Sequence, residues 1–390
     1  MKSETIINRE SQVLAQTYAR YPVELVNGCG ALCEDGNGKK FIDMTSGIGV
    51  NCLGFCDPQW IGAVTDQMMQ IQHACNLFYT RPMVELAEAL VERTPFQRVF
   101  FGNSGAEANE GAIKAARKYG FDHYGKQRTT IITLENSFHG RTITTLAATG
   151  QDVFHNYFFP FTEGFKFAPA NDLDAMLAAI DETVCAVMIE LVQGEGGVVA
   201  LDPEYVTALV AECNKRDILL IVDEVQTGIG RTGTLFCYEQ YQIIPDIVTS
   251  AKGLAGGLPI GAVLLGEKVK DTLSSGLHGT TFGGNPMACA GAVHVLSRVD
   301  DAFLQEVIRK GAYICKRLMK MPHVQEVSGL GLMLGITLDI EVKPIVNACI
   351  ENGLLVLTAK QKLRLLPPLN ISLEVLEEAM DLLEGVLKGF

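Results

Sequence analysis

Lys252 and Asp223 are the two residues whose positions most clearly allow chemistry. Lys252 follows the apolar run Ile247-Val248-Thr249 and precedes the glycine-rich turn Gly253–Gly257. Most lysines are solvated, but one at the mouth of a buried sheet can have a lowered pKa and form a Schiff base with a carbonyl carbon. Asp223 ends the apolar run Ile218–Val222. A carboxylate there needs a partner, which can be a helix N-terminus, an ion pair or the protonated pyridine nitrogen of a pyridoxal phosphate cofactor.

A predicted helix start after residues 98–101 could hold a phosphate group. Ser104 can cap this helix, and Glu107, three residues later, can complete a capping box. The small residues Gly105 and Ala106 leave backbone N–H groups open to an anion, which the helix dipole also favours. A well-capped structural helix explains the same residues, so this segment alone leaves both interpretations open.

Two further segments carry chemistry only in context. Phe138 stands three residues before Arg141, so a stacking ring could lie beside a carboxylate clamp, although a plain polar loop is preferred for that segment alone. Residues 228–233 match the dinucleotide-binding pattern G-x-G-x-x-G. They do not directly follow their strand, no good helix opening comes after them, and no acidic ribose ligand follows a second strand about 20 positions on. A dehydrogenase is therefore disfavoured.

Short apolar runs rich in branched residues predict the strands that position these groups. The runs are 98–101, 130–134, 186–189, 218–222, 247–249 and 262–265, with helical segments such as 203–216 between them. Such runs are typical of strands buried on both faces, and hence of a mostly parallel sheet covered by helices in an α/β fold. The carboxyl ends of such strands are where functional groups gather.

The two ends of the chain differ from this alternating part. Residues 1–20 predict a polar helix ended by Pro22, and Asp35–Gly38 predicts a hairpin turn. The C-terminal part predicts a long helix, two strand regions and a last helix capped by Ser372, over residues 286–321, 324–338, 353–366 and 372–390. We expect three parts: an N-terminal segment that packs with the small domain, a large cofactor-binding domain, and a smaller α+β domain, at residues 1–45, 46–282 and 283–390.

Composition narrows the class of protein. The chain has 390 residues and a formal net charge of −13, which disfavours a nucleic-acid partner. The N-terminus shows no apolar signal core, and no apolar run approaches the ~20 residues of a membrane span. We therefore expect a cytoplasmic protein with no nucleic-acid or membrane partner.

The cysteines leave one distant alternative. Among the eleven cysteines, Cys29 with Cys33 and Cys52 with Cys56 form two C-x3-C pairs, which together could build a four-thiolate zinc site. The surroundings lack the look of a zinc ribbon. We therefore expect reduced, mostly buried cysteines and no metal, with a metal-binding regulatory module as the distant alternative.

Taken together, the segments resemble the class III pyridoxal-phosphate-dependent aminotransferases, in particular their ornithine and acetylornithine branch. The resemblance runs from about residue 20 to the end of the chain. The matching stretches stand in the family's order: FFGNSGAEANEGAIKAARKY, SFHGRTITTLAATG, VQGEGG, DEVQTGIGRTG, AKGLAGGLPIGAV, HGTTFGGNPMACAGA and LRLLPPLNIS. The resemblance implies a fold-type I transferase that works as a homodimer with active sites at the subunit interface.

The resemblance also implies the role of each cofactor contact. Lys252 would hold pyridoxal 5'-phosphate as a Schiff base and later move a proton between substrate and cofactor. Asp223 would pair with the pyridinium nitrogen, because an opposite charge favours protonation. Gln226 would reach the phenolic oxygen, and Phe138 would stack on the ring. The phosphate would be held by Ser104, Gly105, Ala106 and, from the other subunit, Thr281. Glu224 and Val225 complete the expected cofactor-binding set.

The same resemblance implies a reaction with two unlike substrates. Arg364 matches the arginine that binds the α-carboxylate of 2-oxoglutarate, and Glu195 matches the carboxylate that covers it when the amine is bound. A purely structural ion pair between Glu195 and Arg364 would explain the same two residues, since the proposed arrangement includes that pair. Arg141 matches the clamp for the far carboxylate, and Thr280 would lie near the substrate. With LRLLPPL, Arg141 indicates N2-acetylornithine as donor, giving N-acetylglutamate 5-semialdehyde and glutamate in arginine biosynthesis.

Several alternatives stay open at this point. Other donors in the same class are succinylornithine, succinyldiaminopimelate, ornithine and 4-aminobutyrate. An aminomutase would use the same cofactor without an oxo-acid substrate, and the pair of Arg364 with Glu195 speaks against it. The chain departs from the usual pattern at Gly54–Pro58, Leu191 and Ala255, and at Lys360, where glycine is usual before the last strand.

Overall fold

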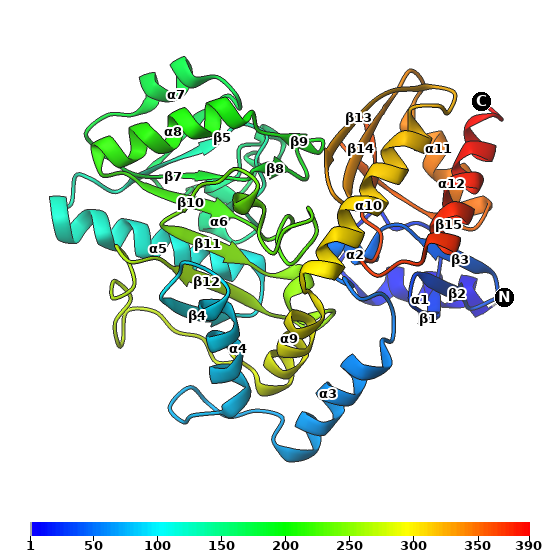
Figure 1. Cartoon of the computed structure of the whole chain (residues 1–390), viewed down its shortest axis with the longest axis horizontal. Helices are drawn as coiled ribbons and strands as arrows, with labels where there is room; N and C mark the ends of the chain where they lie inside the picture. Colours follow the sequence, from blue (N-terminus) through cyan, green and yellow to red (C-terminus); the bar gives the residue numbers. More distant parts are fainter. Residues whose placement is uncertain (1) are drawn as a thin grey trace.

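A seven-stranded sheet forms the centre of the larger part of the molecule in the computed structural model, which describes residues 2–390, with side chains from Ile6 onward (Figure 1). Its strands, in spatial order, are β4 (Arg98–Gly102), β12 (Gly261–Leu265), β11 (Ile247–Ser250), β10 (Leu219–Asp223), β7 (Val184–Ile189), β5 (Thr130–Leu134) and β6 (Phe165–Ala168). Only β12 runs antiparallel to its neighbours β11 and β4. The predicted α/β fold with a mostly parallel sheet is confirmed.

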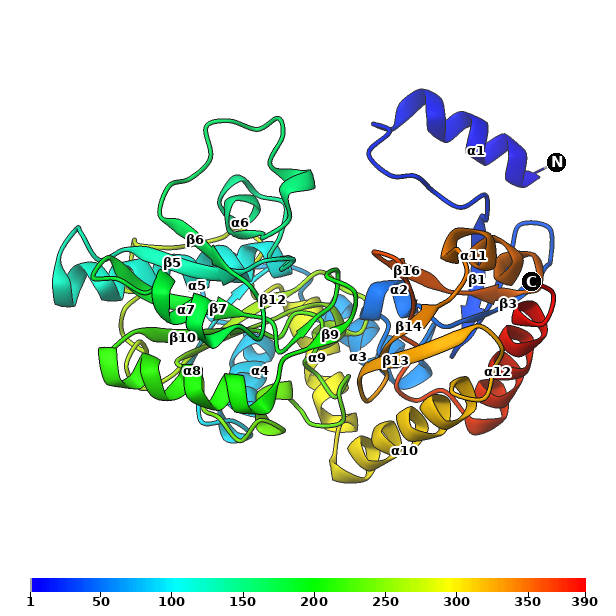
Figure 2. The same ribbon diagram turned by 90° about the horizontal axis from the view of Figure 1, so that it is seen from above.

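Two layers of helices explain why the strands are apolar throughout. On one face, Ile131, Met188 and Ile221 pack with the alanines of α5 (Gly105–Tyr124). The intervening residues pack into the other core with α8 (Pro203–Arg216). Figure 2 shows α5 and α8 on opposite sides of the sheet. Because successive side chains of a strand point to opposite faces, a sheet covered twice needs unbroken apolar runs.

The larger part contains further helices. They are α2 (Ser46–Gly49), α3 (Pro58–Gln70), α4 (Arg81–Glu92), α6 (Ile143–Ala148) and α7 (Leu173–Ala179). A short hairpin of β8 (Val192–Gln193) and β9 (Val199–Ala200) follows β7. Strand β6 was not predicted, because it lies at the sheet edge and its residues are only partly buried, so they form no continuous apolar run.

The smaller part is built on an antiparallel sheet of four strands. In spatial order they are β13 (Val324–Leu330), β14 (Met333–Leu338), β17 (Lys362–Leu365) and β16 (Leu357–Ala359). Its helices are α10 (Asp301–Leu318), α11 (Val342–Glu351) and α12 (Leu373–Leu387), whereas α9 (Pro286–Arg298) packs against α3 and α4 of the larger part. The predicted single helix over 286–321 is wrong. Val299 leaves helical geometry, and the Asp300 side chain accepts a hydrogen bond from the Phe303 N–H, so a new helix begins there.

The N-terminal segment is joined to the C-terminal part of the chain by backbone pairing. The hairpin of β2 (Leu32–Asp35) and β3 (Lys40–Asp43) is confirmed, and β1 (Leu25–Cys29) pairs with β2. Strand β3 also pairs in parallel with β15 (Leu354–Leu355), so blue and orange segments lie side by side in Figure 1. The boundaries at residues 45 and 282 stay a prediction.

The N-terminal helix is shorter than expected. Helix α1 spans Lys2–Val13, whereas the prediction was 1–20, of which residue 1 lies outside the described residues. Residues 14–20 are exposed, so no core supports a longer helix, and the chain turns back with Arg20 Nη1 2.7 Å from Glu10 Oε1. Ser372 caps α12 as predicted. None of the described helices combines the length and apolar character needed to cross a membrane.

Candidate active site

A cavity of about 480 Å³ lies where strands β5, β7, β10 and β11 end. Residues that follow these strands line it, as do residues at the start of α5 and in the turn after Lys252. These four strands run in the same direction and end at the same edge of the sheet, so the residues that follow them lie close together. The predicted site residues in its lining are Ser104, Gly105, Ala106, Phe138, Arg141, Asp223, Val225, Gln226 and Lys252.

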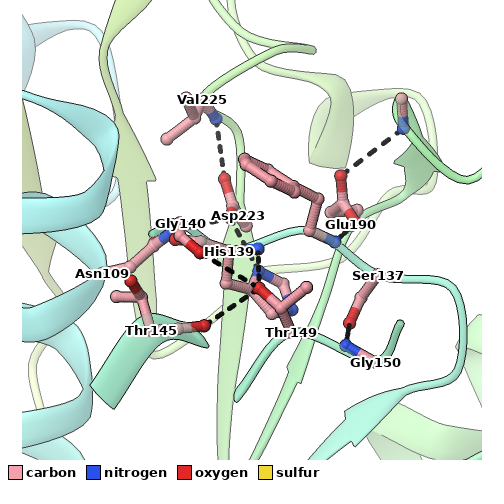
Figure 3. A network of polar contacts seen from close by, with 12 residues as sticks. Asn109, Ser137, His139, Gly140, Thr145, Thr149, Gly150, Glu190, Asp223 and Val225 are labelled. Carbon is pink, nitrogen blue, oxygen red and sulfur yellow. Dashed lines mark hydrogen bonds and ion pairs between the residues drawn. The ribbon is translucent and has the colours of Figure 1, made fainter. Parts of the chain in front are cut away.

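Asp223 lines this cavity and is held by a buried network of hydrogen bonds (Figure 3). Its Oδ2 lies 2.8 Å from His139 Nδ1 and accepts a hydrogen bond from Asn109 Nδ2 at 2.8 Å. Its Oδ1 accepts from the Val225 N–H at 3.0 Å. Burial lowers the pKa of His139, but the hydrogen bond and charge of Asp223 raise it more, so it lies above its ordinary value. The Asp223 carboxylate is therefore fixed in position.

His139, Asn109 and Glu190 belong to the site but were not predicted from the sequence. The Glu190 carboxylate accepts hydrogen bonds from the N–H groups of Phe138 and Gly194, at 2.9 and 3.4 Å. Burial raises the pKa of its carboxyl group to about 7, with a contribution from the Asp223 charge and opposed by His139. Glu190 directly follows a buried strand, which is the signal that selected Asp223. That signal could have found Glu190 as well.

Lys252 begins a short 3-10 turn two residues after the end of β11. Its backbone has φ 44°, in the left-handed region that few residues with side chains adopt. Burial is the main cause that lowers the pKa of its ammonium group below the ordinary value, and Arg364 adds to this. The carboxylates of Glu195, Asp223 and Glu190 oppose it. A lysine with these surroundings loses its proton more easily than a surface lysine, which is what a nucleophilic amine requires.

The start of helix α5 provides a seat for an anion. The Ser104 side chain accepts a hydrogen bond from the Glu107 N–H at 3.1 Å, which confirms the predicted cap. The Glu107 carboxylate accepts from the Asn103 N–H and not from Ser104, so the capping box is incomplete. Gly105 and Ala106 line the cavity, and a helix offers no internal acceptor to its first N–H groups. A Cβ atom at Gly105 would lie 2.7 Å from Val225 Cγ1, so only glycine fits there.

Glu195 and Arg364 form an ion pair just beyond the cavity lining. Arg364 Nη1 donates to Glu195 Oε1 at 2.6 Å and to Gln226 Oε1 at 3.2 Å. Gln226 also donates to Glu195 at 3.4 Å, so it connects the pair to the cavity that it lines. Burial raises the pKa of Glu195, but Arg364 lowers it more, and it lies below its ordinary value. Arg364 Nε has no hydrogen-bond partner among the described residues.

Arg141 lies at the cavity wall between two aromatic rings. Its guanidinium carbon is 4.3 Å from the ring centre of Phe154 and 5.8 Å from that of Phe138. A guanidinium on an aromatic face is stabilised in a fixed orientation. Phe154 belongs to a short turn, Asp152–Phe154, and nothing in its sequence surroundings signalled this role.

Besides Glu195 and Arg364, three predicted residues do not line the cavity. The Glu224 carboxylate points to the Tyr238 N–H, at 2.8 Å, and to the Thr227 hydroxyl. Thr280 accepts a hydrogen bond from Asn103 Nδ2 at 3.1 Å and lines a neighbouring cavity of about 800 Å³. Thr281 is exposed. Contacts from a second subunit would be needed to bring the two threonines to a cofactor, so their roles stay predictions.

The cysteine pairs do not form a recognisable metal site. Cys29 and Cys56 are exposed, whereas Cys33 and Cys52 are buried. Within the part of the chain whose side chains are described, no group of three or more His, Cys, Asp or Glu residues is placed to hold a metal ion. The zinc alternative therefore has no geometric support.

Comparisons with known proteins agree with this geometry. The family model Aminotransferase class-III matches residues 13–387. An acetylornithine aminotransferase from Haemophilus ducreyi is 55% identical over 390 residues, which cover 99% of each chain. The crystal structure of an ornithine aminotransferase from Toxoplasma gondii matches with a TM-score of 0.94 and 33% identity, over 99% of this chain and 95% of that one. That of an N-acetylornithine aminotransferase from Stenotrophomonas maltophilia matches with a TM-score of 0.85 and 35% identity, over 98% and 99%.

Proposed function

This chain belongs to the class III aminotransferase family, and we propose that it transfers the terminal amino group of N2-acetylornithine to 2-oxoglutarate. The products are N-acetylglutamate 5-semialdehyde and glutamate. The family and its fold imply dependence on pyridoxal 5'-phosphate. The observation that carries the proposal is the meeting of Lys252, Asp223 and the start of α5 in one cavity, with the Glu195–Arg364 pair at its edge. The names of the relatives support acetylornithine as the donor.

The residues of the cavity fit pyridoxal phosphate. The first N–H groups of α5 suit its phosphate, the Asp223 carboxylate suits its pyridinium nitrogen, and the Lys252 amine suits its aldehyde carbon. When bound, the cofactor supplies a ring that withdraws electrons from the substrate carbon next to the amine. We assign to Lys252 the covalent attachment of the cofactor and the movement of the proton at that carbon.

His139 supports this chemistry through Asp223. Its Nδ1 hydrogen is assigned from the Asp223 carboxylate, which can only accept. Together with Asn109 it contacts one carboxylate oxygen of Asp223 and holds the carboxylate in place. A charged carboxylate held in this way favours protonation of a ring nitrogen beside it. His139 is thus a positioning residue, and Phe138, the preceding residue in the chain, supplies the ring that we place against the cofactor face.

The Glu195–Arg364 pair explains how one cavity can serve two substrates. While Glu195 neutralises Arg364, the guanidinium does not attract a carboxylate, and an ω-amine can react. When Glu195 turns toward solvent, Arg364 is free to bind the α-carboxylate of 2-oxoglutarate in a bidentate manner. The Glu195 side chain is 32% exposed, which leaves it room to move, whereas Arg364 is buried. We propose that Arg141, whose guanidinium lies against the rings of Phe138 and Phe154, binds the far carboxylate.

A second copy of the chain completes the proposal. Asn76 Nδ2 donates to the backbone oxygens of Thr280 and Gly283, so residues 76–79 lie beside 280–283. This region exposes large apolar side chains: Leu77, Phe78, Tyr79 and Phe282 are 88%, 69%, 98% and 61% exposed. A patch of this kind favours an interface. We propose a homodimer in which Thr281 of the partner subunit contacts the cofactor phosphate.

The test compares amino donors on the purified holoenzyme. Acetylornithine, succinylornithine, ornithine and 4-aminobutyrate are offered at a fixed concentration of 2-oxoglutarate, and acetylornithine should give the highest kcat/KM. Turnover without 2-oxoglutarate would contradict the proposal and indicate an aminomutase reaction instead.

Lys252→Ala is the matching variant. It should lose the absorbance of covalently bound cofactor and all measurable turnover, because no other amine of the cavity lining can take its place. Lys270→Ala, which removes a partly exposed lysine paired with Glu267, is the control and should behave as the native enzyme. Covalent cofactor in Lys252→Ala would contradict the assignment.

A further inference from the structure

Lys360 occupies a backbone position that favours glycine. It is the first of the two residues, 360 and 361, that turn the chain between β16 and β17, where Ala359 pairs with Lys362. Its φ is 51°, in the left-handed region. Two-residue hairpin turns with a positive φ at this position normally carry glycine. A lysine kept in such a conformation is a reason to ask what its side chain does.

The Lys360 ammonium group leaves its own sheet and contacts the large domain. Its Nζ donates to Oδ1 of Asn136, in the loop that follows β5. The Asn136 backbone is fixed in turn, because its N–H donates to the Gly150 carbonyl oxygen at 2.6 Å. Asn136 lies two residues before Phe138, so the contact joins the small-domain hairpin to the loop that carries the proposed stacking ring.

The segment that carries Glu195, residues 193–197, packs against the two loops that this contact joins. Gln193 Nε2 donates to the Glu135 carbonyl oxygen at 2.8 Å, which ties this segment to the residue before Asn136. A Cβ atom at Gly196 would lie 2.8 Å from the Asn136 carbonyl oxygen, and one at Gly197 would lie 4.0 Å from that of Ala359. The segment therefore packs against both sides of the contact.

Arg364, the partner of Glu195, is on the same hairpin as Lys360. It lies on β17 and pairs with Leu357 on β16. The turn that presents Lys360 is therefore connected through three residues of one strand to the guanidinium that Glu195 covers. A contact that holds this hairpin against Asn136 also holds Arg364 over the Glu195 segment.

We propose that Lys360 is a positioning residue that stabilises the paired state of Glu195 and Arg364 by joining their two segments through Asn136. The inference rests on the proposed two-substrate function of that pair. Because the amine donor requires the paired state and 2-oxoglutarate requires the open one, the contact favours the amine donor. Lys360 thus tunes which substrate the site accepts without touching either one.

Four single variants test this inference in the holoenzyme. Lys360→Met keeps the backbone strain and removes the charge, Lys360→Arg keeps a cation, and Asn136→Ala removes the acceptor. Lys362→Met is the matched control, since Lys362 is in the same hairpin but donates to Ser328 within the small domain, at 2.9 Å. Because the contact is exposed, effects are modest.

We expect Lys360→Met and Asn136→Ala to raise the KM for the amine donor about two- to five-fold, with kcat changed less than about two-fold and no rise in the KM for 2-oxoglutarate. Lys360→Arg should restore most of the native KM, and Lys362→Met should leave it unchanged. Equal KM values in Lys360→Met and the native enzyme, or an equal rise for both substrates, would overturn the inference.

A double-variant cycle separates this inference from the proposed function. The unfolding midpoint of Lys360→Met/Asn136→Ala should lie no lower than that of the worse single variant, because both remove one contact. Fully additive shifts would show that the contact does not exist. If the native holoenzyme reacts with neither substrate, the proposed function fails, and this cycle still decides whether Lys360 and Asn136 interact.

Discussion

Arg231 and Arg364 are two buried arginines whose surroundings differ in one instructive way. Each is 2% exposed. Arg231 lies in the loop after β10 and Arg364 lies on β17, and both contact residues from distant parts of the chain. Two of the three hydrogen-bond partners of Arg231 are backbone oxygens, whereas both partners of Arg364 are side chains.

Arg231 holds three chain segments together. Its Nη1 donates to the carbonyl oxygens of Leu332 and Pro367, at 3.1 and 2.5 Å, and its Nη2 donates to the Ser46 hydroxyl at 3.3 Å. Burial lowers the pKa of its guanidinium to about 10, opposed by Cys52 and Asp43. Carbonyl acceptors of this kind cannot move without moving the backbone, so the contact is structural.

Arg364 is held by groups that can leave. Both of its hydrogen bonds go from Nη1 to side chains, those of Glu195 and Gln226, and its Nε is unpaired among the described residues. Burial of a charge therefore does not by itself mark a functional residue. The freedom of the acceptor distinguishes the two cases.

The first prediction concerns Arg231, whose contacts are structural. Arg231→Met leaves three acceptors without a donor, so the free energy of unfolding should fall by about 3 kcal/mol. Urea denaturation followed by circular dichroism measures this, and the folded fraction should keep its KM values. Arg128→Met is the control, because Arg128 donates to three carbonyl oxygens but is only half-buried. It should lose about 1 kcal/mol. Equal losses of unfolding free energy in the two variants would mean that burial does not increase the stability that such an arginine contributes.

The second prediction concerns Arg364, whose side-chain partners can move away. Arg364→Met should lower kcat/KM for 2-oxoglutarate about 100-fold, or about 2.7 kcal/mol of transition-state binding, because the α-carboxylate loses its bidentate partner. Stability should change by less than about 1 kcal/mol, since Glu195 can turn to solvent. Steady-state kinetics with each substrate varied in turn provides the measurement. A loss of stability as large as that of Arg231→Met would remove the distinction between the two arginines.

The sequence predicted well what depends on local pattern. The residues at strand ends, Asp223 and Lys252, were identified because continuous apolar runs fix where a buried strand stops. Ser104 was identified as a cap for the same kind of local reason. Glu190 carries the same signal as Asp223 and was overlooked. The resemblance placed Glu224 in the cofactor set beside Asp223, but adjacent side chains of an extended chain point in opposite directions.

Contacts between distant segments were beyond the local pattern. The pairing of Glu195 with Arg364, 169 residues apart, was expected only through resemblance. Arg231 stood in a G-x-G-x-x-G pattern, and the positive φ values of Gly230 and Gly233, 85° and 103°, belong to the loop that buries it. The break at Val299 and the place of Phe154 against Arg141 depend on packing between segments, which a single sequence does not specify.

The third and smallest effect is expected from acid, which acts on Glu195. Its pKa is lowered by Arg364, so the pair contributes stability above the ordinary pKa of glutamate, 4.5, and loses it as the pH falls through the lower value in the folded protein. The native enzyme should exceed Glu195→Gln in free energy of unfolding by at most about 1 kcal/mol at pH 7, and by less as the pH falls below 4.5. Urea denaturation of both proteins at several pH values measures the difference, in which the other carboxylates cancel. A difference that stays constant with pH would mean that Glu195 does not hold Arg364 as a charge. Carbonyl oxygens cannot be protonated in this pH range, so the hydrogen bonds of Arg231 persist. The ion pair of Arg364 with Glu195 is lost at the same pH, and acid should therefore weaken the contacts of Arg364 but not those of Arg231.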